Sequence, residues 1–337
     1  MQYRLLGNSG LRVSDLCLGT MTFGAAGWGS DEAVSAQIYA RYRDAGGNFL
    51  DTANEIYADG RSEEIIASMI HGHRDEMVIG TKYTNFANAP DPNMAGNHRK
   101  SLRRSLERSL RRLQTDYVDI LWIHAWDFTV APQEVMRALD DAVREGKVLH
   151  VGISNAPAWI IAQCNTLADL RGWTAFAAVQ VEYSLAERSA ELETLPMART
   201  LGLSVLAWSP LAMGALTGKY LKSSGEQRRL DIVPYREAGG HVAEIAGQVA
   251  AIADKHRCSS AAVALAWLNA QPGVIPVIGA RTLSQLADCL SSDRVELDEA
   301  DIHALMAISE PPQTVPHNAI ARGSSIIYGG FAEKIKK

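Results

Sequence analysis

The chain has 337 residues, of which 47% are hydrophobic and 21% are charged. This is an ordinary globular composition, and it excludes disordered, collagen-like and low-complexity proteins. Lys and Arg number 33 and Asp and Glu number 38, which gives a formal net charge of −5. A mildly acidic chain is a poor candidate for binding nucleic acid or an anionic membrane. The length suits two average domains or one large barrel.

The first residues and the cysteines indicate the compartment. The N-terminal segment MQYRLLGNSGLRVSDL has no apolar run of signal-peptide length. The longest apolar stretches are about strand-sized, short of the ~20 residues that cross a membrane. The sequence has no CxxC pair and no Cys near a His at zinc-ligand spacing. We expect reduced, mostly packed thiols in a cytoplasmic protein at Cys17, Cys164, Cys258 and Cys289.

Short apolar runs alternate with amphipathic stretches along the chain. Most of the runs are continuously apolar, as expected of strands that are buried on both faces. We predict eight strands, at Leu16–Leu18, Asn48–Leu50, Met77–Gly80, Val118–Ile123, Val148–Ile153, Ala175–Val179, Ser204–Ala207 and Val274–Val277. Residues typical of helix starts mark the predicted helices. They are a capping Ser62, Pro132 at a first helical position, and Thr282 with Gln285 at the spacing of a capping box. These helices are expected at Ser62–His71, Asn97–Leu113, Pro132–Glu145 and Thr282–Ser291.

This alternation predicts the α/β class and a closed parallel (β/α)8 TIM barrel. The competing open doubly wound sheet lacks its GxGxxG fingerprint, since Gly24, Gly27 and Gly29 have the wrong spacing. No linker or repeat divides the chain, so we expect one domain over residues 1–337. Outside the barrel we expect a hairpin at 1–15 that closes the bottom, a loop and an extra helix at 222–256, and a tail at 311–337 that either covers the cleft or is loose.

Polar residues follow the predicted strands, where a barrel gathers its chemistry. Asp51, Lys82 and His124 follow the second, third and fourth strands, and Tyr57 lies six residues after Asp51. A charge is costly to bury alone and tolerable when it is paired. We therefore expect these side chains to meet at one mouth.

This set of residues has a chemical logic. A tyrosine hydroxyl can protonate a carbonyl oxygen while hydride arrives at the carbon. Its reference pKa is about 10, and a nearby ammonium lowers that pKa. Asp51 would hold Lys82 charged, and His124 would donate to the carbonyl oxygen. Such chemistry requires no metal and no nucleophile, only an external hydride source.

The sequence resembles the aldo-keto reductase superfamily over most of its length. The matching segments are LCLGTM, NFLDTANEIYADGRSEE, GTKY, DYVDILWIHAWD, REGKVLHVGISNA, VQVEYSL, LAWSPLAMGALTGKY and IPVIGARTLSQL. The resemblance implies a (β/α)8 barrel, NADPH-dependent reduction of a small-molecule carbonyl compound, and a catalytic tetrad of Asp51, Tyr57, Lys82 and His124.

The same resemblance implies how NADPH (NADP+) is held. Ser154, Asn155 and Gln180 would hold the nicotinamide carboxamide, and Trp208 would stack on the ring. The segment Ser209–Tyr220 would wrap the pyrophosphate, and Arg281 would pair with the 2′-phosphate, which favours NADPH over NADH. The implied cofactor residues are Gly19, Thr20, Met21, Asp51, Ser154, Asn155, Gln180, Trp208, Ser209, Pro210, Leu211, Gly214, Leu216, Gly218, Lys219, Gly279, Arg281, Gln285 and Asp288.

Two positions depart from the family pattern. Tyr follows the Asp by five residues in related members, so the loop before Tyr57 must bulge, and Ala58 stands where Gly is common. Cys289 occupies a place often held by Asn, which puts one adenine contact in doubt.

Several of these residues also have a purely structural interpretation. Asp51 is then a turn acid, Lys82 an edge residue with its ammonium in water, His124 and Gln180 packed core groups, and Asn155 the cap of the helix containing Pro157. The arginine-rich stretch from Arg99 to Arg112, with Glu107 four residues before Arg111, is expected to be a solvated helix face.

The substrate is less specified than the reaction. Phe23, Trp28, Tyr83 and Trp126, with Phe128, follow strands and either pack under loops or line a mouth for a bulky carbonyl compound. Small aldehydes, keto sugars, steroid-like ketones and keto-trichothecene toxins are all plausible substrates within the family. Two other function classes stay open, an NADPH-binding regulatory subunit and a Schiff-base isomerase or lyase that uses Lys82. Monomer and homo-oligomer are both open.

Overall fold

The fold is a closed barrel of eight parallel strands in the order β10-β3-β4-β5-β6-β7-β8-β9. The computed structural model describes residues 1–337 except 88, 222–227, 233–234, 236, 332–333 and 336–337. Each predicted strand overlaps an observed one, so the (β/α)8 prediction is confirmed and the open-sheet alternative is wrong. The strands are β3 (Cys17–Gly19), β4 (Phe49–Asp51), β5 (Val78–Tyr83), β6 (Val118–Ile123), β7 (Val148–Ser154), β8 (Phe176–Glu182), β9 (Ser204–Trp208) and β10 (Val274–Ile278).

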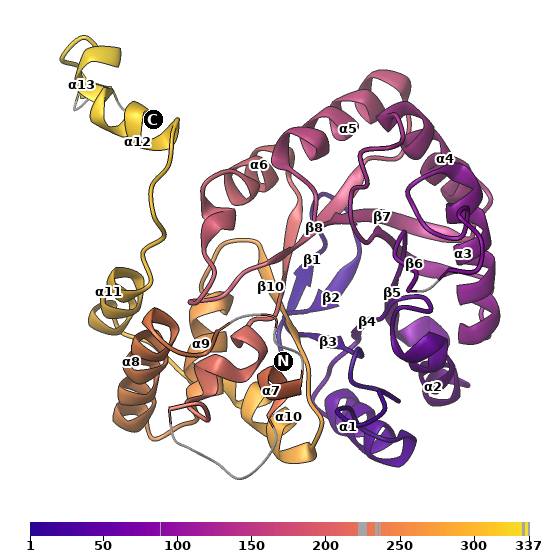
Figure 1. The fold of residues 1–337 in the computed structure, drawn as a ribbon, viewed down its shortest axis with the longest axis horizontal. Helices are drawn as coiled ribbons and strands as arrows, with labels where there is room; N and C mark the ends of the chain where they lie inside the picture. The colour runs from indigo at the N-terminus through magenta and orange to yellow at the C-terminus, as the bar shows by residue number, and fades with distance from the viewer. Residues whose placement is uncertain (88, 222–227, 233–234, 236, 332–333, 336–337) are drawn as a thin grey trace.

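Helices surround the barrel on its outside (Figure 1). The ring consists of α1 (Glu32–Asp44), α2 (Arg61–Ile70), α3 (Arg99–Leu113), α4 (Pro132–Arg144), α5 (Ala158–Arg171), α6 (Thr194–Leu201), α9 (Ser260–Asn269) and α10 (Leu283–Leu290). Their apolar faces pack on the outward-facing strand residues in one large core cluster. This two-layer arrangement buries both faces of every strand, which explains the continuous apolar runs in the sequence.

The barrel interior forms a second, smaller core cluster that contains Cys17, Phe49, Val78 and Trp122. The indole of Trp122 fits because its ring lies over a glycine on each of the two flanking strands. A Cβ on Gly80 would lie 2.6 Å from Trp122 Nε1, and a Cβ on Gly152 would lie 2.3 Å from its ring. This packed floor supports the polar residues at the C-terminal ends of the strands.

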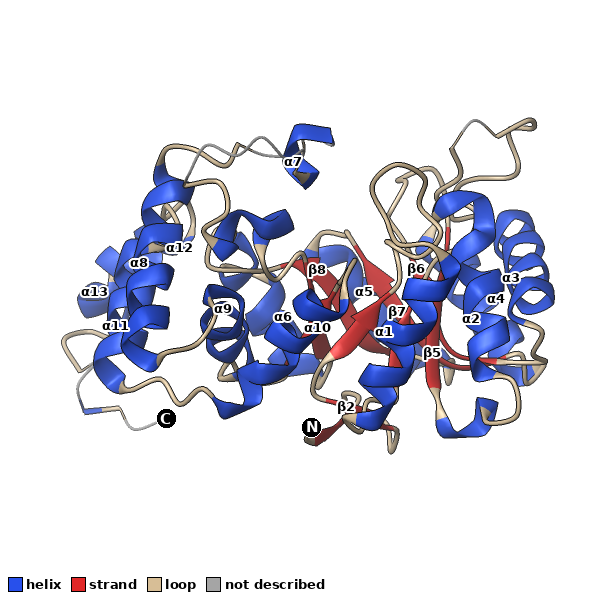
Figure 2. Cartoon of the chain, turned by 90° about the horizontal axis from the view of Figure 1, so that it is seen from below, coloured by secondary structure: helices blue, strands red, loops and turns tan. Residues whose placement is uncertain are grey.

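An antiparallel hairpin of β1 (Tyr3–Leu5) and β2 (Arg12–Ser14) precedes the barrel. Its residues Leu6 and Val13 are fully buried and belong to the interior cluster. The hairpin therefore closes the N-terminal end of the barrel, as expected from residues 1–15. Figure 2 places it at the end opposite to α7 (Arg229–Ile232).

Two predicted helix starts need correction. Gly60, and not Ser62, precedes the first residue of α2. Ser62 is instead fully buried, and its hydroxyl bonds to those of Thr20 (2.8 Å) and Thr52 (2.9 Å). At α10, Thr282 caps the Gln285 N–H as expected, but the Gln285 side chain accepts from Arg281 N (2.9 Å), so the capping box is not reciprocal.

The remaining segments lie outside the ring. The expected extra helix is α8 (His241–His256), which packs on α9 and α11 (Glu299–Ile308). Residues 222–227, 233–234 and 236 of the expected loop lie outside the described residues, but α7 lies within it. The tail carries α12 (His317–Arg322) and α13 (Ser324–Ile327), and it does not cover the mouth of the barrel (Figure 1). His317 lies 3.5 Å from Glu193, the residue before α6. Among the described residues, no helix is both long and apolar enough to span a membrane.

Candidate active site

A buried ion pair lies at the C-terminal ends of β4 and β5. Asp51 is the last residue of β4, and Lys82 is the residue before the end of β5. Lys82 Nζ donates to Asp51 Oδ2 at 2.5 Å and to Thr52 O at 2.7 Å. The Lys82 side chain is fully buried and that of Asp51 is 3% exposed. Lys82 is thus no edge residue, and Asp51 is more than a turn acid.

Tyr57 and His124 complete the cluster around this pair. Lys82 Nζ lies 5.2 Å from the centre of the Tyr57 ring. The rings of Tyr57 and His124 meet edge to face, with their centres 6.2 Å apart. The six-residue spacing is absorbed by a turn in which Tyr57 N donates to Asn54 O at 3.0 Å, followed by Ala58 and Asp59 at positive φ. The structure therefore brings the four predicted side chains together.

Burial and charge set the protonation states in this cluster. Burial alone would lower the pKa of Lys82, but Asp51 and then Tyr57 outweigh it and raise the pKa above its usual value. Burial raises the pKa of Tyr57, and the opposing effect of Lys82 is smaller, so the net shift is upward. Burial, followed by the charge of Lys82, lowers the pKa of His124 to about 3. At neutral pH the cluster therefore contains an ammonium, a protonated phenol and a neutral imidazole.

Buried polar atoms without a partner converge beside the cluster. The Gln180 side chain bonds to the Asp51 carboxyl. Within the described part of the chain, His124 Nδ1 and Ser154 Oγ make no hydrogen bond. Such atoms are costly to bury unless a ligand or water satisfies them. A primary carboxamide offers one acceptor and two donors, so these atoms fit the polar end of a nicotinamide.

Asn155 joins three of the strand ends. It takes a positive φ of 47°, donates from Nδ2 to His124 O (2.9 Å), and accepts at Oδ1 from Trp208 Nε1 (3.2 Å). It does not cap α5, which begins after Pro157 without a side-chain cap. Its role in the structure is to hold the Trp208 indole at the rim of the mouth.

Four cations gather on the β10 side of the mouth. The Arg229 guanidinium stacks on Trp28, 4.8 Å from the ring centre, and Arg281 Nη1 donates to Trp28 O at 3.2 Å. Burial, and then the charges of Arg281, Arg229 and Arg228, lower the pKa of Lys219, and Asp231, which pairs with Arg228 at 3.0 Å, offsets part of this shift. A bound anion would relieve this mutual repulsion, which makes the cluster suitable for phosphate.

The loop beside these cations has an unusual backbone. From Ser209 to Gly218, five residues take positive φ, and three of them, Ser209, Ala212 and Met213, are not glycine. Left-handed residues in a row turn backbone N–H groups toward one side and make a concave anion site. At Gly214 a Cβ would lie 2.4 Å from Lys219 Nζ, so the loop and the cation are closely packed.

The sequence model of the Aldo/keto reductase family matches residues 15–310. The chain belongs to the aldo/keto reductase family. Relatives include norsolorinic acid reductase stcV of Emericella nidulans, 39% identical over 88% of this chain and 78% of the relative. An uncharacterized oxidoreductase YrpG of Bacillus subtilis is 37% identical over 93% of this chain and 97% of the relative. An aryl-alcohol dehydrogenase of Pestalotiopsis microspora is 34% identical over 96% of this chain and 86% of the relative.

Membership in the aldo/keto reductase family makes this chain an oxidoreductase. The family acts on small-molecule carbonyl compounds and generally uses NAD(P)H as the reductant. All four cysteines are free thiols, and three of them are buried. Cys289 is one of these and lies on the buried face of α10.

The other implied cofactor residues differ in their exposure. Thr20 is buried and tied to Ser62, whereas Met21 is 39% exposed and its sulfur accepts from Arg229. Leu216 is fully buried, so its side chain packs in the core and only its backbone is free to face a ligand. Gly279 and Asp288 are exposed. Pro210 is buried and Leu211 and Gln285 are half-buried.

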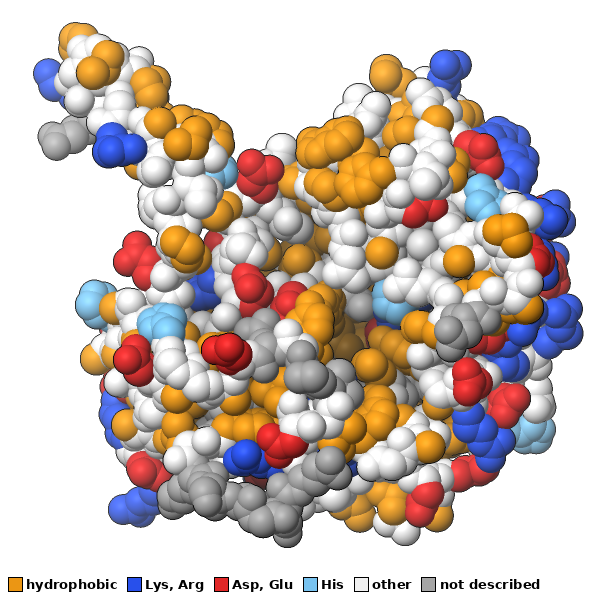
Figure 3. Space-filling model, viewed as in Figure 1, with side chains coloured by type: hydrophobic (Ala, Val, Ile, Leu, Met, Phe, Trp, Pro, Cys, Tyr) orange, Lys and Arg blue, Asp and Glu red, His pale blue; other side chains and the backbone are white. Residues whose placement is uncertain are grey.

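Two of the predicted substrate residues are corrected by the structure. Phe23 and Tyr83 are fully buried in the core beneath the loops, and Tyr83 donates to Asn97 O at 3.4 Å. Trp126 is 6% exposed, and Trp28 is half-buried against Arg229. Figure 3 shows a hollow over the barrel whose visible walls are largely apolar. Trp28 and Trp126 therefore remain as candidates for its rim.

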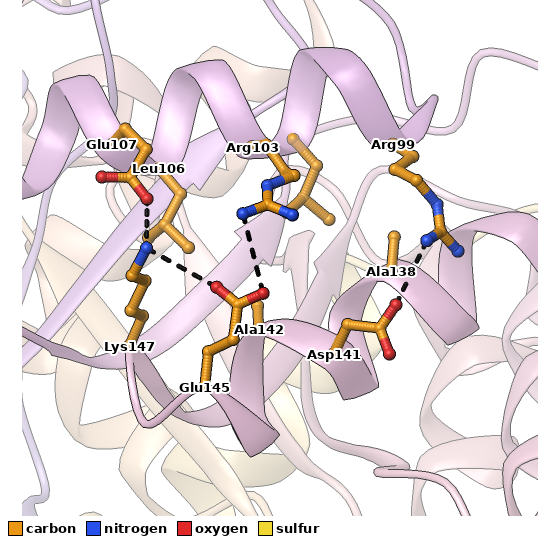
Figure 4. A pocket seen from close by; sticks show the side chains of 10 residues that line it. Arg99, Arg103, Leu106, Glu107, Ala138, Asp141, Ala142, Glu145 and Lys147 are labelled. Carbon is orange, nitrogen blue, oxygen red and sulfur yellow. Dashed lines mark hydrogen bonds and ion pairs between the residues drawn. The ribbon is translucent and has the colours of Figure 1, made fainter.

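The arginine-rich face of α3 is only partly a solvated surface. In the groove between α3 and α4, Arg103 pairs with Glu145, Arg99 with Asp141, and Glu107 with Lys147 instead of Arg111 (Figure 4). At the end of α3 nearest Tyr57, however, Arg108 and Arg112 form ion pairs with buried carboxylates. Arg229 was not among the site residues predicted from the sequence, because its segment shows no helical periodicity.

The lowered pKa of His124 predicts how acid affects stability. With a pKa of about 3 when folded and about 6.5 when unfolded, the unfolded chain binds more protons between these values. The contribution of a neutral His124 to the free energy of unfolding is therefore complete above pH 6.5 and is lost as the pH falls toward 3. Between pH 7 and pH 5 the loss is at most about 2 kcal/mol.

Urea unfolding at pH 7 and pH 5 tests this, with His124→Gln compared against the wild type. The loss between the two pH values should be smaller in His124→Gln, whereas the exposed-site control His303→Gln should keep the wild-type loss. Equal losses in all three proteins would show that the folded state does not hold His124 neutral.

Proposed function

We propose that this protein transfers hydride from NADPH to an aldehyde or ketone and releases an alcohol. The observation that carries the proposal is the convergence of Lys82, Asp51, Tyr57 and His124 beside buried polar atoms that lack partners. When bound, NADPH supplies the hydride from its nicotinamide ring. The protein supplies the proton, the orientation and a site that excludes water.

Residues along the mouth fit each part of the cofactor. Ser154, Asn155 and Gln180 would hold the carboxamide, and Trp208 would stack on the nicotinamide. The Ser209–Tyr220 segment with Lys219 would hold the pyrophosphate, joined by Arg229, whose buried Nε has no partner among the described residues. Arg281 would pair with the 2′-phosphate, and Gln285 and Asp288 would contact the adenosine. Arg229 and Arg281 meet at Trp28, and their charges lower the pKa of Lys219 after burial, which supports the use of NADPH over NADH.

Tyr57 would be the general acid. Its raised pKa keeps the hydroxyl protonated at neutral pH, so a proton is present to be given. As the proton leaves, Lys82 stabilises the phenolate that develops, and this interaction is stronger in the transition state than before it. The neutral ring of His124 would donate a hydrogen bond to the same carbonyl oxygen and fix its orientation.

The substrate we favour is a bulky ketone. The hollow over the barrel is largely apolar (Figure 3), and four relatives are norsolorinic acid reductases. A steroid-like ketone, keto sugar or keto-trichothecene fits such a mouth, which is consistent with a detoxifying reductase in the cytoplasm. A regulatory subunit without catalysis would not need the complete tetrad. A Schiff-base enzyme needs a neutral amine, and Asp51 opposes that state of Lys82.

Replacing the general acid tests the mechanism. Tyr57→Phe should lower kcat for carbonyl reduction by about 10²–10⁴-fold, the usual contribution of a general acid. NADPH binding, followed by fluorescence titration, should stay close to that of the wild type. The control Tyr117→Phe removes an exposed hydroxyl that bonds to Asp75 and should change neither quantity. Near-native turnover of Tyr57→Phe would mean that another group provides the proton.

Removing Arg281 tests the cofactor preference. Arg281→Ala should weaken NADPH binding by roughly 10–100-fold, as expected for a lost charge-assisted hydrogen bond, and should hardly affect NADH. Calorimetric titration with both cofactors measures this difference. Arg294→Ala, an exposed arginine beyond the far end of α10, is the matched control. If the two cofactors lose affinity equally, Arg281 does not recognise the 2′-phosphate.

A further inference from the structure

A chain of ion pairs connects the loop that carries Tyr57 to the strand that carries Lys82. Glu55, two residues before Tyr57, accepts from Arg112 Nη1 and Arg108 Nε, both at 2.6 Å. Arg112 Nε also donates to Glu63 Oε2 at 2.6 Å. Glu63 in turn accepts from the hydroxyl of Thr81 at 2.6 Å, and Thr81 is the residue before Lys82.

The carboxylates of this network are buried, and its charges balance. Glu63 is fully buried and Glu55 is 8% exposed. Two carboxylates face two guanidinium groups, so neither sign is left in excess. Buried ion pairs add little net stability compared with well-packed apolar residues, because desolvation offsets much of their attraction. Their better-attested use is to specify one geometry.

Arg112 contacts both flanks of the Tyr57 turn. On the N-terminal side it pairs with Glu55. On the C-terminal side it packs against Gly60, where a Cβ would lie 2.8 Å from Arg112 Cδ and Nε. Ala58, Asp59 and Gly60 all take positive φ, from 51° to 89°. Non-glycine residues in this region persist only when their surroundings hold them there.

We infer that Arg112, with Glu55 and Glu63, is a positioning residue that fixes Tyr57 against Lys82. The loop is one residue longer than the five-residue spacing, and the extra residue gives it additional freedom. The network removes that freedom by tying the loop to β5 at the position next to Lys82. This inference rests on the proposed function, in which Tyr57 gives a proton beside Lys82.

Arg108 completes the anchor from the same helix. Arg108 and Arg112 are four residues apart, so they lie one above the other on one face of α3. Asn54 adds a neutral contact, since its Nδ2 donates to Asn85 O and to Ser105 Oγ, both at 3.1 Å. The loop is thus held at residues 54 and 55 by α3 and the end of β5, directly before Tyr57.

Glu55→Gln is the sharpest test, because it leaves the buried Arg112–Glu63 pair intact. Hydrogen–deuterium exchange should become faster in peptides that cover residues 52–60. kcat should fall by about tenfold or more, since small misplacements of a reacting group are costly, whereas the NADPH Kd should stay within about twofold. Arg112→Lys keeps the charge but loses the planar fork that bridges two carboxylates, so it should show the same pattern.

The matched control is Glu145→Gln, which removes ion pairs to Arg103 and Lys147 between α3 and α4. It should leave both loop exchange and kcat at wild-type values. Unchanged exchange over residues 52–60 in Glu55→Gln, or faster exchange with unchanged kcat, would overturn the inference. If neither the wild type nor Glu145→Gln reduces any carbonyl compound, the proposed function fails instead, and the exchange data still decide whether the anchor exists.

Discussion

The ion pair between Lys82 and Asp51 is the interaction on which the site depends. An ammonium with no exposed surface is tolerated only because a carboxylate lies 2.5 Å away and a backbone carbonyl 2.7 Å away. The barrel makes this possible, since parallel strands bring Asp51 and Lys82 to one end while hydrophobic residues fill the interior below. The charge held there then determines what its neighbours can do. It opposes a charge on His124 and favours a developing phenolate at Tyr57.

The mouth combines two kinds of polar region. Beside the ion pair lie two buried polar atoms without partners among the described residues, His124 Nδ1 and Ser154 Oγ, and Arg229 and Arg281 lie close together at Trp28. Both are unfavourable in the protein alone, and both are complementary to parts of a phosphorylated nicotinamide cofactor. The left-handed run in Ser209–Gly218 is a further local cost that a phosphate-binding role accounts for. The features that destabilise the protein alone thus lie where the proposed cofactor would stabilise it on binding.

The strand ends were predictable because a buried strand has no reason of its own to end in Asp51, Lys82 or His124. The contacts between side chains were not predictable in the same way. Phe23 and Tyr83 follow strands like residues that face a mouth, yet the loops fold over them and bury them. Arg229 lies in a segment without periodicity. The pairing of Arg112 with Glu55 and Glu63 depends on how α3 packs against α2, which helix periodicity alone does not give.

A double-mutant cycle on the central ion pair is the most direct test. The free energy of unfolding would be measured by urea denaturation for Asp51→Asn, Lys82→Met and the double variant. Because each single change leaves one buried group without its partner, we expect each to cost about 3–5 kcal/mol and the double variant to lose far less than the sum. Losses that simply add would contradict the account, because they would mean that the two groups do not hold each other in place.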